Sequence, residues 1–191
     1  LSTPIDQDAT VKIITAKDKE GLEIIRHSTA HTLAQAVKNL FPNTQIVIGP
    51  IIEDGFYYDL LPSQSFSEKD LLKIEQEMKK ISAANYPIQK ETWTRKEAIA
   101  FFKKIGEKFK AELIAEISED QPITVYKQGN FLDLCRGPHV PSTKFAKHFK
   151  LTKVSGAYWK GDSKNVMLQR IYGTAWSSKE DLDQYLYKIE E

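Results

Sequence analysis

The chain has 191 residues, of which 41% are hydrophobic and 28% are charged, and its formal net charge is +1. This length fits one domain, or one domain with an appendage, and is enough to bury a core. The near-zero charge gives no overall field for a polyanion, so nucleic-acid contacts would have to come from local patches. No apolar run reaches membrane-spanning length, which argues against a membrane protein.

The single cysteine, Cys135, cannot form an internal disulfide. It argues for a reducing compartment, and we expect a cytoplasmic location. The first ten residues, LSTPIDQDAT, lack the basic start and apolar middle of a signal peptide. Because the chain begins without Met and ends in a helix-like segment, we expect it to be an excised part of a longer protein.

The first third of the chain predicts a strand, a long helix and a hairpin. Residues 9–15 alternate and are rich in β-branched side chains, as in a strand. Over residues 22–41 apolar side chains recur at helical spacing, and Pro42 ends the helix. Residues 44–61 are typical of two strands around a hairpin-favouring Asp-Gly dipeptide.

The middle of the chain predicts three helices and one strand between them. Ser67 can cap a helix over residues 68–85, with Asp70 where the capping box usually has Glu. Residues 86–93 predict an edge strand. The other two helices are expected over residues 94–106 and 107–117.

The last third predicts a hairpin over residues 123–135, a loop over 136–144, strands over 147–162 and 166–176, and a helix over the last dozen residues. Hairpins between neighbouring strands imply antiparallel pairing. We therefore predict an α+β fold in two layers, with helices packed on one face of an antiparallel sheet.

Three of the four histidines and the only cysteine are concentrated in two pentapeptides, HSTAH and CRGPH. His27 and His31 lie one turn apart on one helix face. Cys135 and His139 cannot form a matching helical pair, because a Gly-Pro pair interrupts them, and they bracket a loop at a strand end instead. If that strand end faces the helix, these four residues, here called the tetrad, converge.

Three interpretations of the tetrad remain open at this point. Two helical histidines and a buried, apolar-like cysteine can be incidental. Imidazole and thiolate also suit a structural zinc site of the Cys-His₃ type, although C-x₃-H is an uncommon spacing. The third interpretation is a catalytic pocket, in which imidazoles position or activate a water and the thiol is a polar wall or weak acid–base group.

Five segments, HSTAH, IGPIIEDGFYYD, FLDLCRGPHVP, GAYWKGDS and MLQRIYGTAW, together resemble the amino-terminal editing region of bacterial threonyl-tRNA synthetases. The resemblance runs from about Asp6 to Glu191. The HxxxH and CxxxH pairs alone are shared with a wider group that includes alanyl-tRNA synthetases and free-standing editing proteins. The segments YWKGDS and LQRIYGTAW narrow the resemblance to the threonyl branch.

The resemblance implies two parts. Residues 1–18 would be the final strand and exit of a small ubiquitin-like (TGS-type) domain, and residues 19–191 the editing domain. The aminoacylation domain, with its ATP and zinc, would lie outside this chain. The implied function is hydrolysis of mischarged Ser-tRNA(Thr) in a second pocket too small for threonine. Serine lacks one methyl group, a difference worth only ~1–3 kcal/mol, so a synthetic site that accepts threonine cannot reject serine well.

The family's site residues match these positions: His27, His31, Lys110, Asp133, Cys135 and His139 as catalytic residues, with Tyr58 and Asp133 as substrate-binding residues. Lys108 is the alternative to Lys110. The resemblance implies that His27 and Lys110 hold the attacking water and offset oxyanion charge. Asp133 would bind the seryl ammonium or hydroxyl.

Cys135 and His31 would form the wall that excludes the methyl group, and His139 would orient the terminal adenosine or a water. The threonyl branch implies a site that works without bound metal. Zinc held by the tetrad is the alternative.

Two basic stretches are interleaved with aromatic residues, FFKKIGEKFK and TKFAKHFKLTK. Such stretches suit phosphate contacts and base stacking. We expect the second stretch, with Lys144, Lys147 and Lys150, to lie near the acceptor end of tRNA(Thr). The rest of the synthetase would act in cis, and we expect a monomeric fragment of a homodimeric parent. A zinc-stabilised module that only binds the acceptor stem, or an inert spacer domain, are the alternatives.

Overall fold

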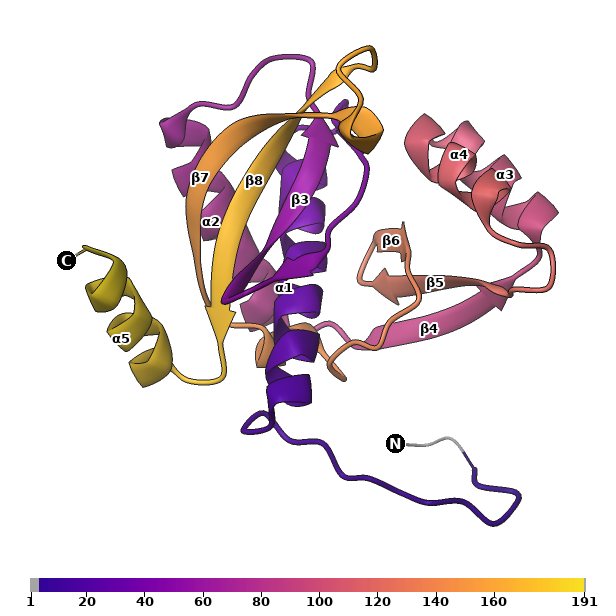
Figure 1. Ribbon diagram of the computed structural model, residues 1–191, viewed down its shortest axis with the longest axis horizontal. Coiled ribbons are helices and arrows are strands. Elements are labelled where there is room, and N and C mark those ends of the chain that lie inside the picture. The colour runs from indigo at the N-terminus through magenta and orange to yellow at the C-terminus, as the bar shows by residue number, and fades with distance from the viewer. Residues whose placement is uncertain (1–3, 191) are drawn as a thin grey trace.

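The computed structural model describes residues 4–190, and its elements surround one long helix, α1 (Lys19–Leu40). Ten consecutive positions of this helix, residues 28–37, are buried. A helix buried on all sides must be covered by several elements. Figure 1 shows α1 between a larger and a smaller sheet. No helix within residues 4–190 is long and apolar enough to cross a membrane.

The larger sheet is antiparallel, with the strand order β1-β3-β8-β7 and with β2 also paired to β3. Its strands are β1 (Gln45–Ile46), β2 (Ile51–Ile52), β3 (Gly55–Leu61), β7 (His148–Tyr158) and β8 (Met167–Trp176). The turn between β2 and β3 is the predicted Asp-Gly hairpin, in which Asp54 has a φ of +58°. Figure 1 shows β3, β8 and β7 side by side.

Helices α1 and α2 (Glu68–Ala84) cover one face of the larger sheet. Because side chains alternate along a strand, Phe56, Tyr58 and Leu60 of β3 all point to this face, and all three are fully buried. They join the main hydrophobic core together with residues of α1, α2 and β8. The phenol of Tyr58 is thereby carried into an apolar interior, where it needs a polar partner.

The smaller sheet has the order β4-β5-β6, also antiparallel. Its strands are β4 (Ile88–Trp93), β5 (Ile123–Gln128) and β6 (Phe131–Leu134), and its helices are α3 (Arg95–Lys104) and α4 (Lys108–Glu116). A second apolar cluster, which includes Phe102, Ile114 and Val125, joins these helices to the sheet. The smaller sheet therefore has its own helices and its own apolar cluster, and Phe131 of β6 and Ile88 of β4 also pack into the main core.

The predicted α+β class and its antiparallel strands are confirmed. The predicted helices and hairpins also lie where the sequence indicated, including the capping box of Ser67 and Asp70 at the start of α2. The structure divides the strands between two sheets, a division that the sequence did not predict. The chain continues after the second hairpin through the 3₁₀ turn η1 (Thr143–Phe145), and η2 (Trp159–Gly161) and α5 (Lys179–Glu190) complete the fold.

The predicted strand over residues 9–15 is wrong. These residues are exposed and have no regular secondary structure. Their alternating pattern suits a strand, but a strand is stabilised by pairing with a neighbour, and this segment pairs with neither sheet. Residues 1–3 of the predicted ubiquitin-like part lie outside the described residues, and the boundary at residue 18 remains a prediction.

A buried carboxylate joins the two halves of the fold. Glu107, at the start of α4, accepts hydrogen bonds from the backbone N–H of Ile46 at 2.9 Å and from Lys38 Nζ at 2.7 Å. Lys38 Nζ also donates to the carbonyls of Pro42 and Thr44. The beginning of α4 is therefore fixed to the end of α1 and to β1.

Candidate functional site

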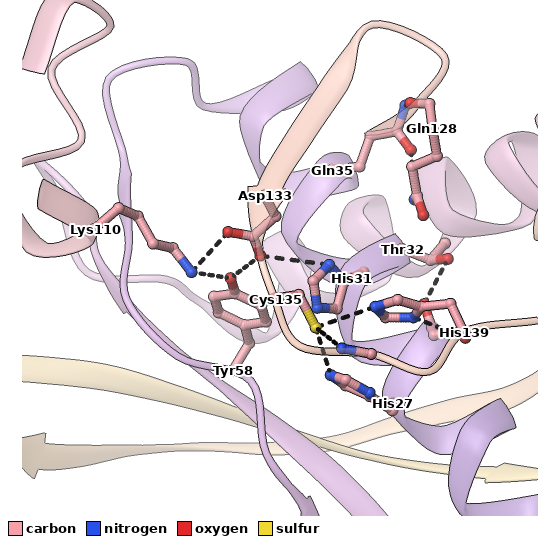
Figure 2. A network of polar contacts seen from close by, with 12 residues as sticks. His27, His31, Thr32, Gln35, Tyr58, Lys110, Gln128, Asp133, Cys135 and His139 are labelled. Atoms are coloured by element: carbon pink, nitrogen blue, oxygen red, sulfur yellow. Dashed lines mark hydrogen bonds and ion pairs between the residues drawn. The ribbon is translucent and has the colours of Figure 1, made fainter. Parts of the chain in front are cut away.

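The two pentapeptides that the sequence singled out meet where β6 ends against α1. His27 and His31 project from one face of α1, and Cys135 follows directly after β6. The four potential ligand atoms of the tetrad all lie within 4.8 Å of one another. Figure 2 shows the three imidazoles gathered around the sulfur of Cys135.

The thiol is held by hydrogen bonds to two of the imidazoles. Cys135 Sγ lies 3.2 Å from His27 Nε2 and 3.2 Å from His139 Nε2, and it accepts a bond from the backbone N–H of Gly137. A thiol has one proton, so it can donate to only one of the two nitrogens. The other imidazole must donate its own proton to the sulfur.

The outer contacts of the imidazoles decide between these two arrangements. His27 Nδ1 lies 3.3 Å from the carbonyl oxygen of Pro138, which can only accept, so Nδ1 carries the proton of that ring. In the neutral ring the Nε2 of His27 is then free to accept the S–H. His139 Nε2 donates to the sulfur, and its Nδ1, at 3.0 Å from Ser28 Oγ, accepts the hydroxyl proton.

Burial keeps these groups uncharged. Desolvation lowers the pKa of His27 and His139, and it lowers the pKa of the fully buried His31 well below its ordinary value of 6.5. The charge of the Lys110 ammonium, and that of His27 whenever its imidazole is protonated, lower the pKa of His31 further. Burial also raises the pKa of the Cys135 thiol to about 11. At neutral pH the tetrad is therefore three neutral imidazoles and one thiol.

A second polar group, here called the buried triplet, adjoins the tetrad. It consists of Tyr58 from β3, Lys110 from α4 and Asp133 from β6. Lys110 Nζ lies 2.7 Å from Asp133 Oδ1 and donates to the Tyr58 hydroxyl at 3.0 Å, and that hydroxyl donates to Asp133 Oδ2 at 2.6 Å. All three side chains are buried. Figure 2 shows them converging from three separate elements.

Asp133 connects the triplet to the tetrad. Its Oδ2 lies 3.4 Å from His31 Nδ1, so Nδ1 of that ring faces an acceptor and carries its proton. The Nε2 of His31 is left unprotonated. Burial, followed by the adjacent Asp133 carboxylate, raises the pKa of Tyr58 well above its ordinary value, which keeps the phenol a hydrogen-bond donor.

A cavity of about 260 Å³ opens between the two groups. The triplet and three members of the tetrad, His27, His31 and Cys135, line it. Ile48, Leu113 and Ile117 form an apolar part of its wall. Pockets for drug-sized ligands usually measure about 300–1,000 Å³, so this one suits a group of amino-acid size better than a nucleotide.

Gly49 explains how the Tyr58 ring fits against this wall. A Cβ built on Gly49 would lie 2.3 Å from Cδ2 of Tyr58, which no side chain tolerates. Glycine at this position therefore lets the backbone before β2 lie directly against the ring. Only the folded structure shows this contact, although the segment IGP that contains the glycine is part of the family resemblance.

Not every predicted site residue lines the cavity. His139 contacts the sulfur but does not line the cavity, and both its ring nitrogens are engaged by Cys135 and Ser28. Of the two candidate lysines, Lys110 is buried in the site, whereas Lys108 is exposed and lies over the ring of Phe109.

The predicted RNA-contacting lysines lie apart from this cavity. Lys144 and Lys147, in and just after η1, are exposed and make no ion pair within residues 4–190. Lys150 is on β7, and its Nζ lies 3.2 Å from the buried carboxylate of Glu75. Part of its charge is therefore already balanced inside the protein.

Ser28 was not predicted as a site residue. It is fully buried. Its hydroxyl oxygen contacts His139 Nδ1 and accepts a hydrogen bond from the backbone N–H of Val140 at 3.1 Å. It therefore fixes the loop after Cys135 against α1. Its position inside HSTAH carries no signal of this role, because its partner lies 111 residues away.

The donor set of the tetrad also fits zinc chemically. One cysteine and three histidines form a known type of ligand set, and two of the histidines have the backbone or carboxylate partners on Nδ1 that commonly orient metal-bound imidazoles. Zinc would bind the thiolate, so it would displace the thiol proton.

Part of the chain matches a known protein family. Residues 123–172, from β5 through most of β8, match the threonyl and alanyl tRNA synthetase second additional domain. This region contains the Asp133 and Cys135 side of the site, the family segment GAYWKGDS and the first six residues of MLQRIYGTAW. This stretch of the chain is therefore similar to a domain that occurs in these two kinds of synthetase.

Comparisons that cover the whole of this chain point to the threonyl branch. The chain is 57% identical over 191 residues to the threonine–tRNA ligase of Rickettsia bellii (strain OSU 85-389) and 59% identical over the same length to that of Rickettsia africae (strain ESF-5). It is 60% identical over 192 residues to that of Orientia tsutsugamushi (strain Boryong). Each alignment covers 100% of this chain and 30% of the relative. The predicted resemblance to threonyl-tRNA synthetases is confirmed, and the chain spans about a third of the length of these relatives.

Proposed function

We propose that this domain edits mischarged tRNA by hydrolysing the seryl ester of Ser-tRNA(Thr). The observation that supports this most directly is the cavity of about 260 Å³, in which a buried Tyr-Lys-Asp triplet faces two imidazoles and a thiol. The triplet offers charge and hydrogen bonds to a polar amino acid, and the tetrad offers groups that can hold a water. Both are needed to cleave an aminoacyl ester.

Size is the proposed basis of selectivity. A pocket that fits serine rejects threonine only if protein atoms fill the space that the extra methyl group of threonine would need. The synthetic site of the same synthetase must accept threonine, so it cannot reject the smaller serine by size. Cys135 and His31 are the proposed wall at this place. His31 is fixed by Asp133 and Cys135 by two imidazoles, so the wall cannot retreat freely.

In the proposed reaction a water oxygen attacks the ester carbonyl carbon, and the bond from that carbon to the ribose oxygen breaks. His27 is the proposed group that takes the water proton, because it lines the cavity and its Nε2 is unprotonated. Its Nε2 accepts the Cys135 S–H in this structure, so it would have to exchange that hydrogen bond for one from the water. The proton then goes to the departing ribose oxygen, which leaves free serine and a tRNA with its hydroxyl restored. The ammonium of Lys110 would offset the negative charge on the carbonyl oxygen.

Asp133 is the proposed partner of the seryl ammonium or hydroxyl. Its carboxylate already contacts Lys110 and Tyr58, so the substrate group would have to join or replace one of these contacts. The role proposed for His139 is narrower than the resemblance implied. Because it contacts the Cys135 sulfur and does not line the editing cavity, it would position the thiol rather than touch the seryl group.

The proposed setting is a synthetase in the cytoplasm. Aminoacylation would be supplied in cis by a region that corresponds to the part of the relatives that this chain does not cover. The isolated domain is proposed to be a monomer and to contact the tRNA acceptor end through Lys144 and Lys147.

The test is incubation of the 191-residue chain with Ser-tRNA(Thr) and, separately, with Thr-tRNA(Thr), with measurement of the aminoacyl ester that remains. We expect rapid loss of the seryl ester and slow loss of the threonyl ester. The His27→Ala variant should hydrolyse the seryl ester at a strongly reduced rate, whereas Lys164→Ala, a change at an exposed position between β7 and β8, should not. Equal loss of both esters, or none, would contradict the proposal.

The tetrad also favours a second function, a zinc-stabilised module that binds the acceptor stem without cleaving it. The two functions differ in metal content and turnover. Zinc analysis of the purified chain, followed by chelation, separates them. Stoichiometric zinc whose removal unfolds the domain, together with binding but no hydrolysis, would support the second function; a zinc-free chain that hydrolyses the seryl ester would exclude it.

A further inference from the structure

Three adjoining cavities follow the amino-terminal half of α1. The cavity of the proposed editing site shares His27 with a second cavity of about 520 Å³, and that one shares Ile14 and Ile24 with a third of about 480 Å³. The third cavity also reaches His139, which does not line the editing cavity but contacts Cys135 at 3.2 Å. The third cavity therefore adjoins the tetrad at His139 and extends to η1 without including the residues of the second cavity that carry negative charge.

The third cavity has the composition of a nucleotide site. Ile24, Ile25 and Val140 contribute an apolar floor, and Lys144 and Lys147 supply cationic groups. Phe145, between these lysines in sequence, is 48% exposed, a large solvent-facing fraction for an aromatic ring. Stacking on an aromatic side chain and contact of phosphate with lysines are the two usual modes of single-stranded RNA binding.

Charge distinguishes this cavity from its neighbour. The second cavity is lined by Glu20 and Glu23, which would repel a phosphate. The third is lined by no acidic residue within the described chain. Burial and the nearby Lys147 and Lys179 lower the pKa of His148, which also lines the cavity, as expected where positive charges gather.

We propose that the third cavity binds one nucleotide of a single-stranded RNA 3′ end, with the base against Phe145 and the phosphate at Lys144 and Lys147. This rests on the proposed function, because it places the nucleotide on the same RNA strand whose end would enter the editing cavity. It goes beyond that function by assigning a stacking residue and a bounded cavity. The occupant is an RNA nucleotide rather than an anion alone, because the floor is apolar and the ring is exposed.

The test is binding of the 191-residue chain to a fluorescein-labelled single-stranded RNA of five nucleotides ending in CCA, followed by anisotropy at several salt concentrations. Lys147→Gln should weaken binding and flatten the plot of log K against log salt concentration by about 0.7, the contribution of one phosphate contact on a single strand. Phe145→Leu should weaken binding about fivefold or more, with an unchanged slope, because it removes stacking and no charge.

Matched controls lie at the far end of the same hairpin. Lys164→Gln removes an exposed lysine from the β7–β8 turn, and Tyr158→Leu removes a ring that is 41% exposed at the other end of β7. Neither residue lines the third cavity. Both controls should bind the RNA like the parent chain, and thermal unfolding of all four variants checks that each is folded.

Two outcomes would overturn the proposal. One is an affinity and salt slope for Lys147→Gln and Phe145→Leu equal to those of their controls. The other is a loss of RNA affinity in Lys147→Gln but not in Phe145→Leu, together with equal displacement of the RNA by inorganic polyphosphate from the parent chain and from Phe145→Leu. This result would show that the surface binds anions and is not a nucleotide site. The experiment measures RNA binding and not ester hydrolysis. Its result is therefore distinguishable from that of the hydrolysis test: a chain without hydrolytic activity can still bind the RNA in this cavity, and an active hydrolase can lack this nucleotide site.

Discussion

Lys110 Nζ lies 2.7 Å from Asp133 Oδ1, and both side chains are almost completely buried. The two residues come from α4 and β6, which belong to the smaller half of the fold, and their partner Tyr58 comes from the larger sheet. The ion pair therefore lies where the two halves meet, and it forms one wall of the cavity. Its energetics and its proposed chemistry can be separated by mutation.

Lys110→Met should destabilise the chain by about 3–5 kcal/mol, because it leaves the Asp133 carboxylate buried without its cation. The double variant Lys110→Met/Asp133→Leu should recover much of this loss, since no charge remains unpaired. Neither should hydrolyse Ser-tRNA(Thr). Denaturant unfolding and deacylation measure the two effects. A double variant no more stable than Lys110→Met, or one that retains activity, would contradict the prediction.

Tyr58→Phe should cost about 1–3 kcal/mol of stability, because Asp133 loses a buried hydrogen-bond donor at 2.6 Å while the core keeps its ring. The control is Tyr57→Phe, one residue away on the opposite, partly exposed side of β3. We expect it to change the free energy of unfolding by no more than about 0.5 kcal/mol. Urea unfolding of both variants compares them, and equal losses would show that the Tyr58 hydroxyl is not special.

Ser28→Ala should weaken the tetrad without removing a member. It leaves the His139 Nδ1 and the Val140 N–H without their buried partner, at an expected cost of about 1–3 kcal/mol. The His139 ring should then change tautomer or orientation, which ¹⁵N NMR of the imidazoles detects. Ser65→Ala, at an exposed position before α2, is the control. An unchanged His139 spectrum in Ser28→Ala would contradict the assigned hydrogen-bond arrangement.

Glu107→Ala should reduce both stability and proposed hydrolysis, because Glu107 fixes the beginning of α4, the helix that carries Lys110. Glu107→Gln can still accept the Ile46 N–H and should recover part of both. The effect on hydrolysis should appear in kcat with little change in KM, since Glu107 lies outside the cavity that would hold the ester. An effect confined to stability would show that α4 needs no such anchor for the chemistry.

The capping box of α2 predicts a pH dependence of stability. Hydrogen bonds from the backbone and hydroxyl of Ser67 lower the pKa of Asp70 below its ordinary value of 3.8. A carboxyl with a depressed folded-state pKa stabilises the fold above the unfolded-state value, and this contribution is lost as the pH falls through the folded-state value. The stability difference between the parent and Asp70→Asn should therefore be constant from pH 5 to 7 and shrink below about pH 4. Guanidinium unfolding at each pH checks it, and a pH-independent difference would contradict it.

The local structure and the members of the tetrad could be predicted from the amino-acid sequence. Helical periodicity predicted α1, the Ser67 cap predicted the start of α2, and Asp-Gly predicted the hairpin before β3, because these signals act between residues close in the chain. The rarity of histidine and cysteine was enough to select the tetrad.

The way in which distant segments combine became known only from the folded structure. It selected Lys110 over Lys108, moved His139 behind the thiol, added Ser28, and left residues 9–15 unpaired. The physical reason is that these outcomes depend on contacts between groups 52 to 111 residues apart, such as Lys110 with Tyr58 and Ser28 with His139. Residue spacing along the chain specifies which face of an element a side chain occupies, whereas its partner is set by how the two halves of the fold pack together.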